Sequence, residues 1–169
     1  MATGTYPLNP LSAIPDPTNS PGLNFTGTTN RPYLAFDGAG AAEACVWTFY
    51  MPSNFASSPV IQIIWSSSAN PGSPNDVVRW SASVMATTPE TDSVANDSDS
   101  FDTENAQTDT YLGTTAKRPQ RCTVSLANAD SLAAGDYVAV QIKRNSADAA
   151  DTMASDAWLW AAALEYTTT

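Results

Sequence analysis

Two segments in the C-terminal third of the chain alternate apolar and polar side chains with a period of two residues, the period of a β-strand. In residues 136–144, Val138, Val140 and Ile142 share one face. In residues 157–166, the same period groups four apolar side chains on one face: Trp158, Trp160, Ala162 and Leu164. The two segments predict a pair of long strands with one buried face each, joined by an acidic, Ala-rich loop.

Six earlier segments have the composition and length of strands, and turn-forming residues separate them. These segments are Tyr33–Phe36, Glu43–Met51, Pro59–Ser66, Asp76–Ala86, Thr110–Thr115 and Gln120–Leu126. The clearest turns are Asp37–Gly40 and Asn70–Asn75, whereas residues 87–109 form a long acidic loop. Eight short strands predict an all-β fold, and we expect residues 32–169 to form a single jelly-roll-like antiparallel β-sandwich.

The first 31 residues are rich in proline and contain only scattered apolar side chains. Proline removes backbone donors, so neither a helix nor a central strand is expected there. A disordered leader is one interpretation. The other is an extended N-terminal arm, residues 1–31, whose apolar side chains bind a partner. The candidate anchors are Tyr6, Leu8, Leu11, Ile14, Leu23 and Phe25.

The chain is strongly acidic, with a formal net charge of −10. Nucleic-acid affinity comes largely from lysine and arginine, so we expect neither nucleic acid nor an anionic membrane as a partner. No secretion signal or membrane-spanning apolar run is apparent, which predicts a product that stays where it is made. Cys45 and Cys122 fall on apolar faces and are expected to be buried thiols, although a disulfide is possible if their strands face each other.

The chain contains no histidine. This excludes Ser-His-Asp and Cys-His catalysis, zinc sites with histidine ligands and imidazole acid–base chemistry. Paired carboxylates remain a possible catalytic device, because a glycoside hydrolase needs only two acids across a cleft. The candidates are Glu43, Glu90, Glu104 and Glu165. They do not pair on one predicted face, so we expect no enzyme activity, no catalytic residues and no cofactor.

Calcium and sugar sites are two further possibilities. Oxygen ligands in Asp97–Asp102, or in the set Asp148, Asp151 and Asp156, could hold calcium, but solvated loops are the simpler interpretation and we predict no metal. Five tryptophans could stack on sugar rings: Trp47, Trp65, Trp80, Trp158 and Trp160. Their place in regular strands favours the core instead. Three tyrosines are expected to be exposed: Tyr50, Tyr111 and Tyr166.

The closing stretch of residues 131–166, SLAAGDYVAVQIKRNSADAADTMASDAWLWAAALEY, resembles the end of β-sandwich virion structural proteins of tailed bacteriophages. Similar features occur earlier: a YLAFD strand at residues 33–37, an aromatic strand closed by Met51 and Pro52, and an acidic loop around residues 97–101. The resemblance covers about residues 32–166.

This resemblance implies a non-enzymatic capsid decoration, or cement, protein. Such a protein would be made in the host cytoplasm, bind the major capsid protein on the capsid surface of the virion, stabilise the shell and form a homotrimer whose arms add avidity. One alternative is a receptor- or glycan-binding module of a phage fibre or tail appendage. The other is a carboxylate-dependent polysaccharide hydrolase.

Overall fold

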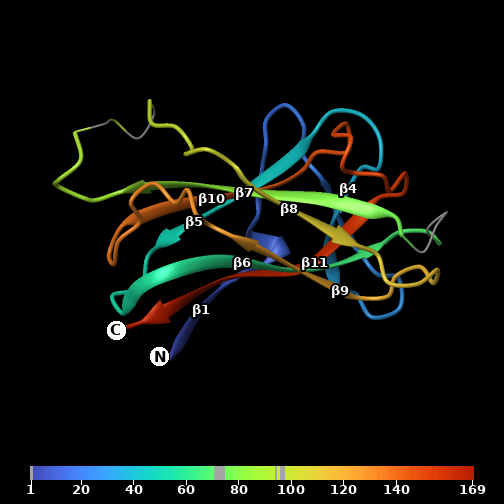
Figure 1. Cartoon of the computed structure of the whole chain (residues 1–169), viewed down its shortest axis with the longest axis horizontal. Helices are drawn as coiled ribbons and strands as arrows, with labels where there is room; N and C mark the ends of the chain where they lie inside the picture. Colours follow the sequence, from blue (N-terminus) through green and yellow to red (C-terminus); the bar gives the residue numbers. More distant parts are fainter. Residues whose placement is uncertain (1, 71–74, 94, 96–97) are drawn as a thin grey trace.

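The computed structural model describes residues 2–70, 75–93, 95 and 98–169, and it consists of two antiparallel β-sheets packed face to face (Figure 1). The elements are β1 (Thr3–Leu8), the 3₁₀ helix η1 (Pro10–Ser12), β2 (Ile14–Pro15), β3 (Gly22–Phe25), β4 (Pro32–Phe36), β5 (Glu43–Tyr50), β6 (Phe55–Ser67), β7 (Val77–Thr87), β8 (Asn105–Thr110), β9 (Gln120–Ser125), β10 (Tyr137–Arg144) and β11 (Ala157–Thr168). The prediction of an all-β antiparallel sandwich is confirmed.

One sheet has the order β3-β4-β11-β6-β9, with β1 pairing to the distal part of β11, and the other has the order β2-β5-β10-β7-β8. We call the first sheet the lower layer and the second the upper layer, because β1, β6 and β11 lie below β7 and β10 in Figure 1. Seven of the eight strands expected from the sequence correspond to strands of the structure, with β4, β6, β9 and β11 in one layer and β5, β7 and β10 in the other. Both members of the predicted C-terminal pair are central strands, β10 in the upper layer and β11 in the lower layer, rather than neighbours in one sheet.

Alternating side chains from both layers fill the core. The predicted inward residues of β10, Val138, Val140 and Ile142, are fully buried. Trp65 of β6 and Trp80 of β7 meet across the core with ring centroids 6.2 Å apart in an edge-on arrangement. Aromatic pairs prefer such edge-on contacts to face-to-face stacking. Cys45 and Cys122 are buried free thiols, as expected.

The N-terminal region does not form an arm separate from the sandwich. Strand β1 pairs with β11 from Thr3 opposite Thr167 to Leu8 opposite Ala162, and two shorter strands, β2 and β3, follow it. Because β1 has a sheet partner on one side only, Pro7 can lie in it without removing a donor that a second neighbour needs. The proline density is therefore compatible with edge strands, and the expectation of a separate extended arm over residues 1–31 is not met.

Two of the six predicted anchors pack inside the chain's own sandwich. Leu8 is fully buried, and the ring of Tyr6 stacks on Phe49 with centroids 4.1 Å apart. The other four are about half exposed: Leu11, Ile14, Leu23 and Phe25. A partner-binding role for these four stays a prediction.

The strand predicted at Thr110–Thr115 is placed too late in the sequence. Strand β8 ends at Thr110, and the following residues form a loop that includes Gly113 at φ +94°. Glycine adopts that backbone conformation without the clash that a Cβ atom causes. The predicted turn at 70–75 falls largely outside the described residues, as does Asp97 of the candidate calcium loop.

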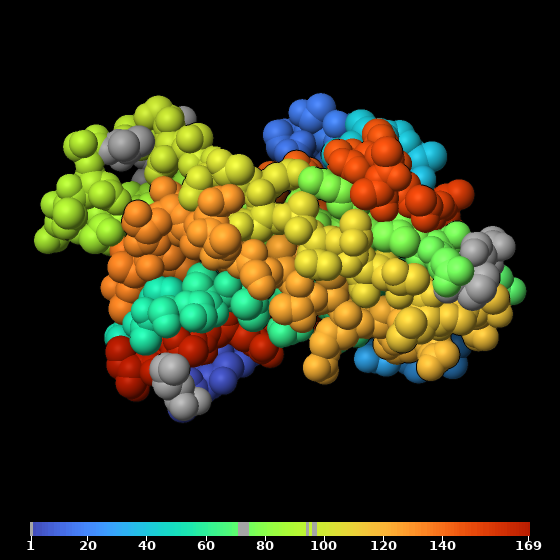
Figure 2. Space-filling view, viewed as in Figure 1, coloured from blue at the N-terminus to red at the C-terminus, as the bar shows by residue number. Residues whose placement is uncertain are grey.

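The two chain ends lie side by side, since the amide of Thr168 donates to the carbonyl of Ala2 at 3.0 Å (Figure 1). Figure 2 shows the described residues that follow β7, in yellow-green, projecting beyond one end of the sandwich. Among the described residues, no helix has the length and apolarity needed to cross a membrane.

Candidate functional site

A β-bulge in β11 turns two tryptophans to the outside of the lower layer. Leu159 lies opposite Trp65 of β6 and Ala161 lies opposite the next residue, Ile64, so Trp160 has no counterpart. An extra residue of this kind reverses which side chains face the core from that point on. Leu159 and Ala162 are consequently both buried, and Trp158 and Trp160 are both only partly buried. The prediction that these tryptophans share the inner face of Ala162 and Leu164 is wrong.

The two partly buried indoles form a cluster with Tyr33 of β4. The Tyr33 ring stacks on Trp158 with centroids 4.3 Å apart and an interplanar angle of 30°. Its centroid is 4.9 Å from that of Trp160. The indoles of Trp158 and Trp160 lie 5.7 Å apart with their planes at 77° to each other. Trp160 is therefore steeply inclined to the stacked pair of Tyr33 and Trp158, and the three rings form a corner.

This corner is part of a concave site of about 390 Å³, which we call the aromatic pocket. Its lining residues are Phe25, Thr26, Gly27, Thr28, Tyr33, Lys117, Trp158 and Trp160. The volume lies in the range of roughly 300 to 1,000 Å³ that is usual for small-molecule sites. A mostly aromatic wall with a few hydroxyl and cationic groups at the rim suits a ligand with one flat apolar face and several polar edges.

Buried polar contacts hold the ring of Trp160 in position. Its Nε1 donates to the Oγ of Ser66 on β6 at 2.9 Å, and Ser66 is fully buried. The hairpin loop between β3 and β4, residues 26–31, is closed by the amide of Thr26 donating to the Arg31 carbonyl and by the Arg31 amide donating to the hydroxyl of Thr26. The ring of Trp160 and the hairpin loop between β3 and β4 are therefore held in place before a ligand arrives, so binding costs them little conformational entropy.

Lys117 enters from the connection between β8 and β9. Its amide donates to the carbonyl of Ser67 at 2.9 Å, which joins the connection to the end of β6. The hydroxyl of Tyr111 donates to the Thr115 carbonyl and accepts from the Arg118 amide, so a fully buried ring anchors the loop from inside. The expectation that Tyr111 is exposed is wrong for this reason.

The prediction of exposure is right for one of the other two tyrosines and wrong for the second. Tyr50 is 68% exposed, as predicted, and Tyr166 is only 4% exposed because it packs between β1 and Phe55. Tyr50 and Tyr137 line a separate concavity of about 490 Å³ on the upper layer, which also contains Glu90 and Asp92. Their ring centroids are 6.1 Å apart at 61°, so these two rings do not form a flat aromatic platform.

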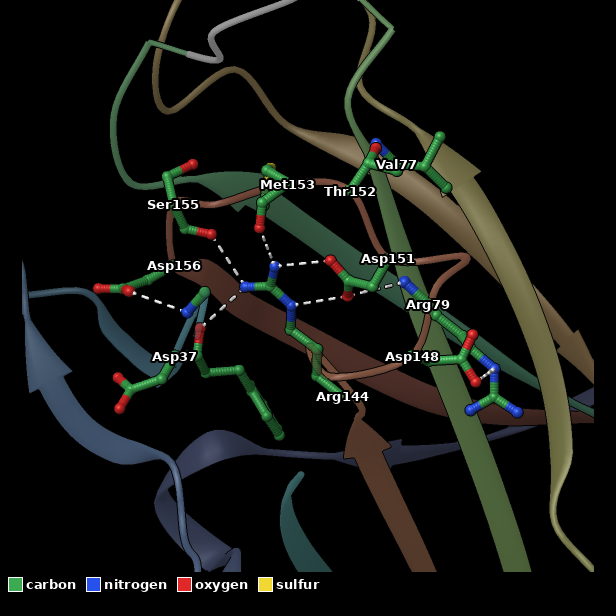
Figure 3. Close-up of polar contacts among 12 residues, drawn as sticks. Asp37, Val77, Arg79, Arg144, Asp148, Asp151, Thr152, Met153, Ser155 and Asp156 are labelled. Carbon is green, nitrogen blue, oxygen red and sulfur yellow. Dashed lines mark hydrogen bonds and ion pairs between the residues drawn. The ribbon is translucent and has the colours of Figure 1, made fainter. Parts of the chain in front are cut away.

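A buried ion pair ties together the strands that carry the aromatic pocket (Figure 3). Arg144 at the end of β10 donates to both carboxylate oxygens of Asp151 at 2.9 Å. Its Nη1 donates to the carbonyls of Phe36 at the end of β4 and of Ser155 just before β11. Because Tyr33 lies on β4 and the two tryptophans lie on β11, this guanidinium fixes the elements that bring the three rings together.

The described carboxylates of the two candidate calcium loops are engaged within the protein. Asp148 pairs with Arg79, Asp151 pairs with Arg144, and Asp156 accepts from the Gly38 amide (Figure 3). In the other loop, Asp99 accepts from the Thr87 hydroxyl and Asp102 from the Asp130 amide. Within the part of the chain that the structure describes, no cluster of three or more acidic or thiol ligands has a geometry that could hold a metal ion.

The candidate catalytic carboxylates are dispersed over the fold. Glu43 lies on β5, Glu90 follows β7, Glu104 precedes β8 and Glu165 lies on β11. Hydrogen bonds from Lys143 and Arg79 lower the pKa of Glu104 to about 2, which makes this side chain a poor proton donor at neutral pH. Burial raises the pKa of Glu43, but this carboxylate already accepts a hydrogen bond from the Asp37 amide at 2.7 Å.

By sequence, no family model and no curated protein matches the chain. By structure, it is similar to a family 35 carbohydrate-binding module from an environmental isolate, with a TM-score of 0.52, 12% identity and coverage of 97% of each chain. It is also similar to the xylan-binding module CBM15, with a TM-score of 0.50, 14% identity and coverage of 99% of each chain. Both neighbours are non-catalytic modules, and at these identities the likeness concerns the fold.

These similarities correct the resemblance to phage virion proteins and, with it, the expected role in capsid decoration. The sequence features behind that resemblance were alternating strands, a YLAFD segment and acidic loops. Such features are common to many antiparallel sandwiches, because each follows from burying one face of a sheet and exposing its turns. They predicted the fold class correctly and carried no information about the protein family.

Proposed function

We propose that this protein is a non-catalytic carbohydrate-binding module whose ligand site is the aromatic pocket. The observation that carries the proposal is the corner formed by Tyr33, Trp158 and Trp160, three aromatic side chains turned outward from a rigid sheet. A pyranose ring has an apolar face of C–H groups and an edge of hydroxyls. It can lay that face on an indole while its hydroxyls reach polar groups at the rim.

Other features support the same assignment. Thr26 and Thr28 place hydroxyls on the rim, and the hairpin that carries them is closed by its own hydrogen bonds. The structural neighbours of the chain include a xylan-binding module, and the likeness extends over nearly the whole of both chains. For the sandwich itself we propose the jelly-roll-like arrangement, because consecutive strands from β4 to β11 change sheet at every connection except that between β7 and β8.

The test is to measure binding to soluble xylan, mannan, mixed-linked glucan and galactan by affinity electrophoresis, and then by isothermal titration calorimetry with oligosaccharides of the best binder. Trp158→Ala should weaken binding about 30-fold, since removing a central tryptophan from a binding site costs about 2 kcal/mol or more. Tyr50→Ala is the matched control, because it removes an exposed aromatic ring from the other layer. It should leave the affinity unchanged.

Two results would overturn the proposal. If the wild-type chain binds none of these glycans, and none on an array, the protein is not a carbohydrate-binding module. If Tyr50→Ala abolishes binding while Trp158→Ala has no effect, the ligand site is the concavity on the upper layer. Circular dichroism of each variant establishes that the sandwich is folded.

A further inference from the structure

The seven basic residues of the chain are distributed unevenly with respect to the aromatic pocket. Arg79, Lys143 and Arg144 each form an ion pair with a carboxylate. Arg31 and Lys117 instead lie over the two partly buried indoles of the pocket. The Cζ of Arg31 is 6.0 Å from the ring centroid of Trp160, and the Nζ of Lys117 is 5.1 Å from that of Trp158.

Neither of these two cations has an acidic partner among the described residues, and both side chains are exposed. No aspartate or glutamate that the structure describes lines the aromatic pocket, although the chain contains 17 acidic residues and has a net charge of −10. With Lys117 in its lining and Arg31 beside it over Trp160, the pocket is a locally positive site on a negatively charged protein. Its charge is opposite in sign to that of the molecule as a whole.

From this arrangement we propose that the aromatic pocket selects a sugar bearing a single anionic group, a uronic acid carboxylate or a sulfate ester, within an otherwise neutral glycan. This inference rests on the proposed carbohydrate-binding function and specifies its ligand class. The neutral pyranose face packs on the indoles, and the anionic group accepts hydrogen bonds from Lys117 and Arg31. A guanidinium and an ammonium are the side chains best suited to carboxylate and sulfate oxygens.

The net charge of the protein explains why a single anionic group is preferred to many. A densely charged polyanion would bring many like charges close to a surface with a net charge of −10, and this repulsion is felt over about 10 Å at moderate salt. An isolated anionic substituent meets only the two local cations. Charge complementarity in the pocket thus favours a sparsely substituted chain over a polyuronate or a heavily sulfated glycan.

The contacts that the cations make without ligand are weak enough to be exchanged. A cation over an exposed aromatic ring is worth only about two- to fivefold in an equilibrium constant. A hydrogen bond between charged groups is worth roughly tenfold or more. An anionic sugar can therefore draw Lys117 and Arg31 toward its own charge, which uncovers the faces of Trp158 and Trp160 for the pyranose rings.

The experiment uses the full chain and oligosaccharides in matched pairs. One pair is a xylo-oligosaccharide carrying one glucuronic acid and the same compound with that carboxyl group reduced to the alcohol. Equivalent pairs are built on mannose, glucose and galactose oligomers, together with sulfated and desulfated galactose oligomers, and polygalacturonate serves as the dense polyanion. The charged member of at least one pair should bind about tenfold more tightly than its neutral counterpart, and about 0.5 M NaCl should remove most of that difference.

Lys117→Gln and Arg31→Gln should each weaken binding of the charged member severalfold without weakening binding of the neutral member. Arg118→Gln is the matched control. It removes one positive charge from the same loop, but its guanidinium donates to the Leu112 carbonyl, whereas Lys117 and Arg31 lie over the indoles of Trp158 and Trp160. It should leave both affinities unchanged.

The outcomes separate the two proposals. If neutral and charged members bind equally well and binding still requires Trp158, the charge selectivity is wrong and the carbohydrate-binding function stands. The charge selectivity is equally wrong if polygalacturonate binds best, or if Arg118→Gln has the effect expected of Lys117→Gln. If no member of any pair binds, both proposals fail together.

Discussion

Replacing Arg144 with methionine tests the buried ion pair that joins β4, β10 and the start of β11. Neither Arg144 nor Asp151 has appreciable exposure, with side chains 0% and 1% accessible. Methionine fills much of the space of the arginine stem but leaves a buried carboxylate without its cation. Asp151 keeps one hydrogen bond, from the Arg79 amide at 3.0 Å, whereas the carbonyls of Phe36 and Ser155 lose their donor.

The expected cost is about 3 to 5 kcal/mol, the range found when one partner of a buried ion pair is removed. This is a large share of the roughly 5 to 15 kcal/mol by which a domain is stable. With a urea m-value of about 2 kcal/mol per molar, a loss of about 4 kcal/mol lowers the unfolding midpoint by about 2 M. Tryptophan fluorescence reports the transition, because Trp65 and Trp80 lie in the core.

Two further variants make the measurement specific. Lys143→Met removes the neighbouring cation on β10, whose pair with Glu104 is partly exposed, and should cost no more than about 1 kcal/mol. The double variant Arg144→Met with Asp151→Leu leaves no unpaired buried charge and should recover most of the loss. If Arg144→Met unfolds within about 1 kcal/mol of the wild-type protein at an unchanged m-value, the ion pair does not hold these strands together.

The remaining predictions concern titratable groups. Lys143 and Arg79 lower the pKa of Glu104 from 4.5 to about 2, so this carboxylate stabilises the fold above pH 4.5 and its contribution is lost as the pH falls toward 2. Glu104→Gln should therefore be less stable than the wild-type protein at about pH 6, and urea titrations should show the difference shrinking toward pH 2. Burial raises the pKa of the Cys45 thiol and raises that of Cys122 to about 12. Both should resist alkylation at about pH 8 until the protein unfolds, and rapid labelling of either in the folded protein would contradict its burial.

The mistaken resemblance to virion proteins illustrates how little a β-sandwich pattern says about function. Turn chemistry and alternation are shared by all antiparallel sandwiches, since both follow from the geometry of the pleated sheet. Function depends on which few side chains are turned outward together. In the binding site that we propose, those are Tyr33, Trp158 and Trp160, with Lys117 beside them. Nothing local in the sequence distinguishes these tryptophans from Trp65 and Trp80, which are buried.

The sequence by itself determined the fold class and most of the strands. The alternation of Val138, Val140 and Ile142 requires a strand with one buried face, and the absence of histidine excludes every catalytic device that depends on an imidazole. Local patterns are sufficient for these inferences because side-chain period and residue type act over a few neighbouring positions.

Only the tertiary structure decided the composition of the aromatic pocket and the place of the N-terminal residues. Thr3–Leu8 forms a strand because it pairs with the part of β11 that has no other neighbour on that side, and a proline-containing segment can occupy such an edge position. The bulge at Trp160 depends on the register between β11 and β6, two strands about 100 residues apart in sequence. Register is a long-range property, and a shift of one residue is enough to move Trp158 and Trp160 from the core to the surface.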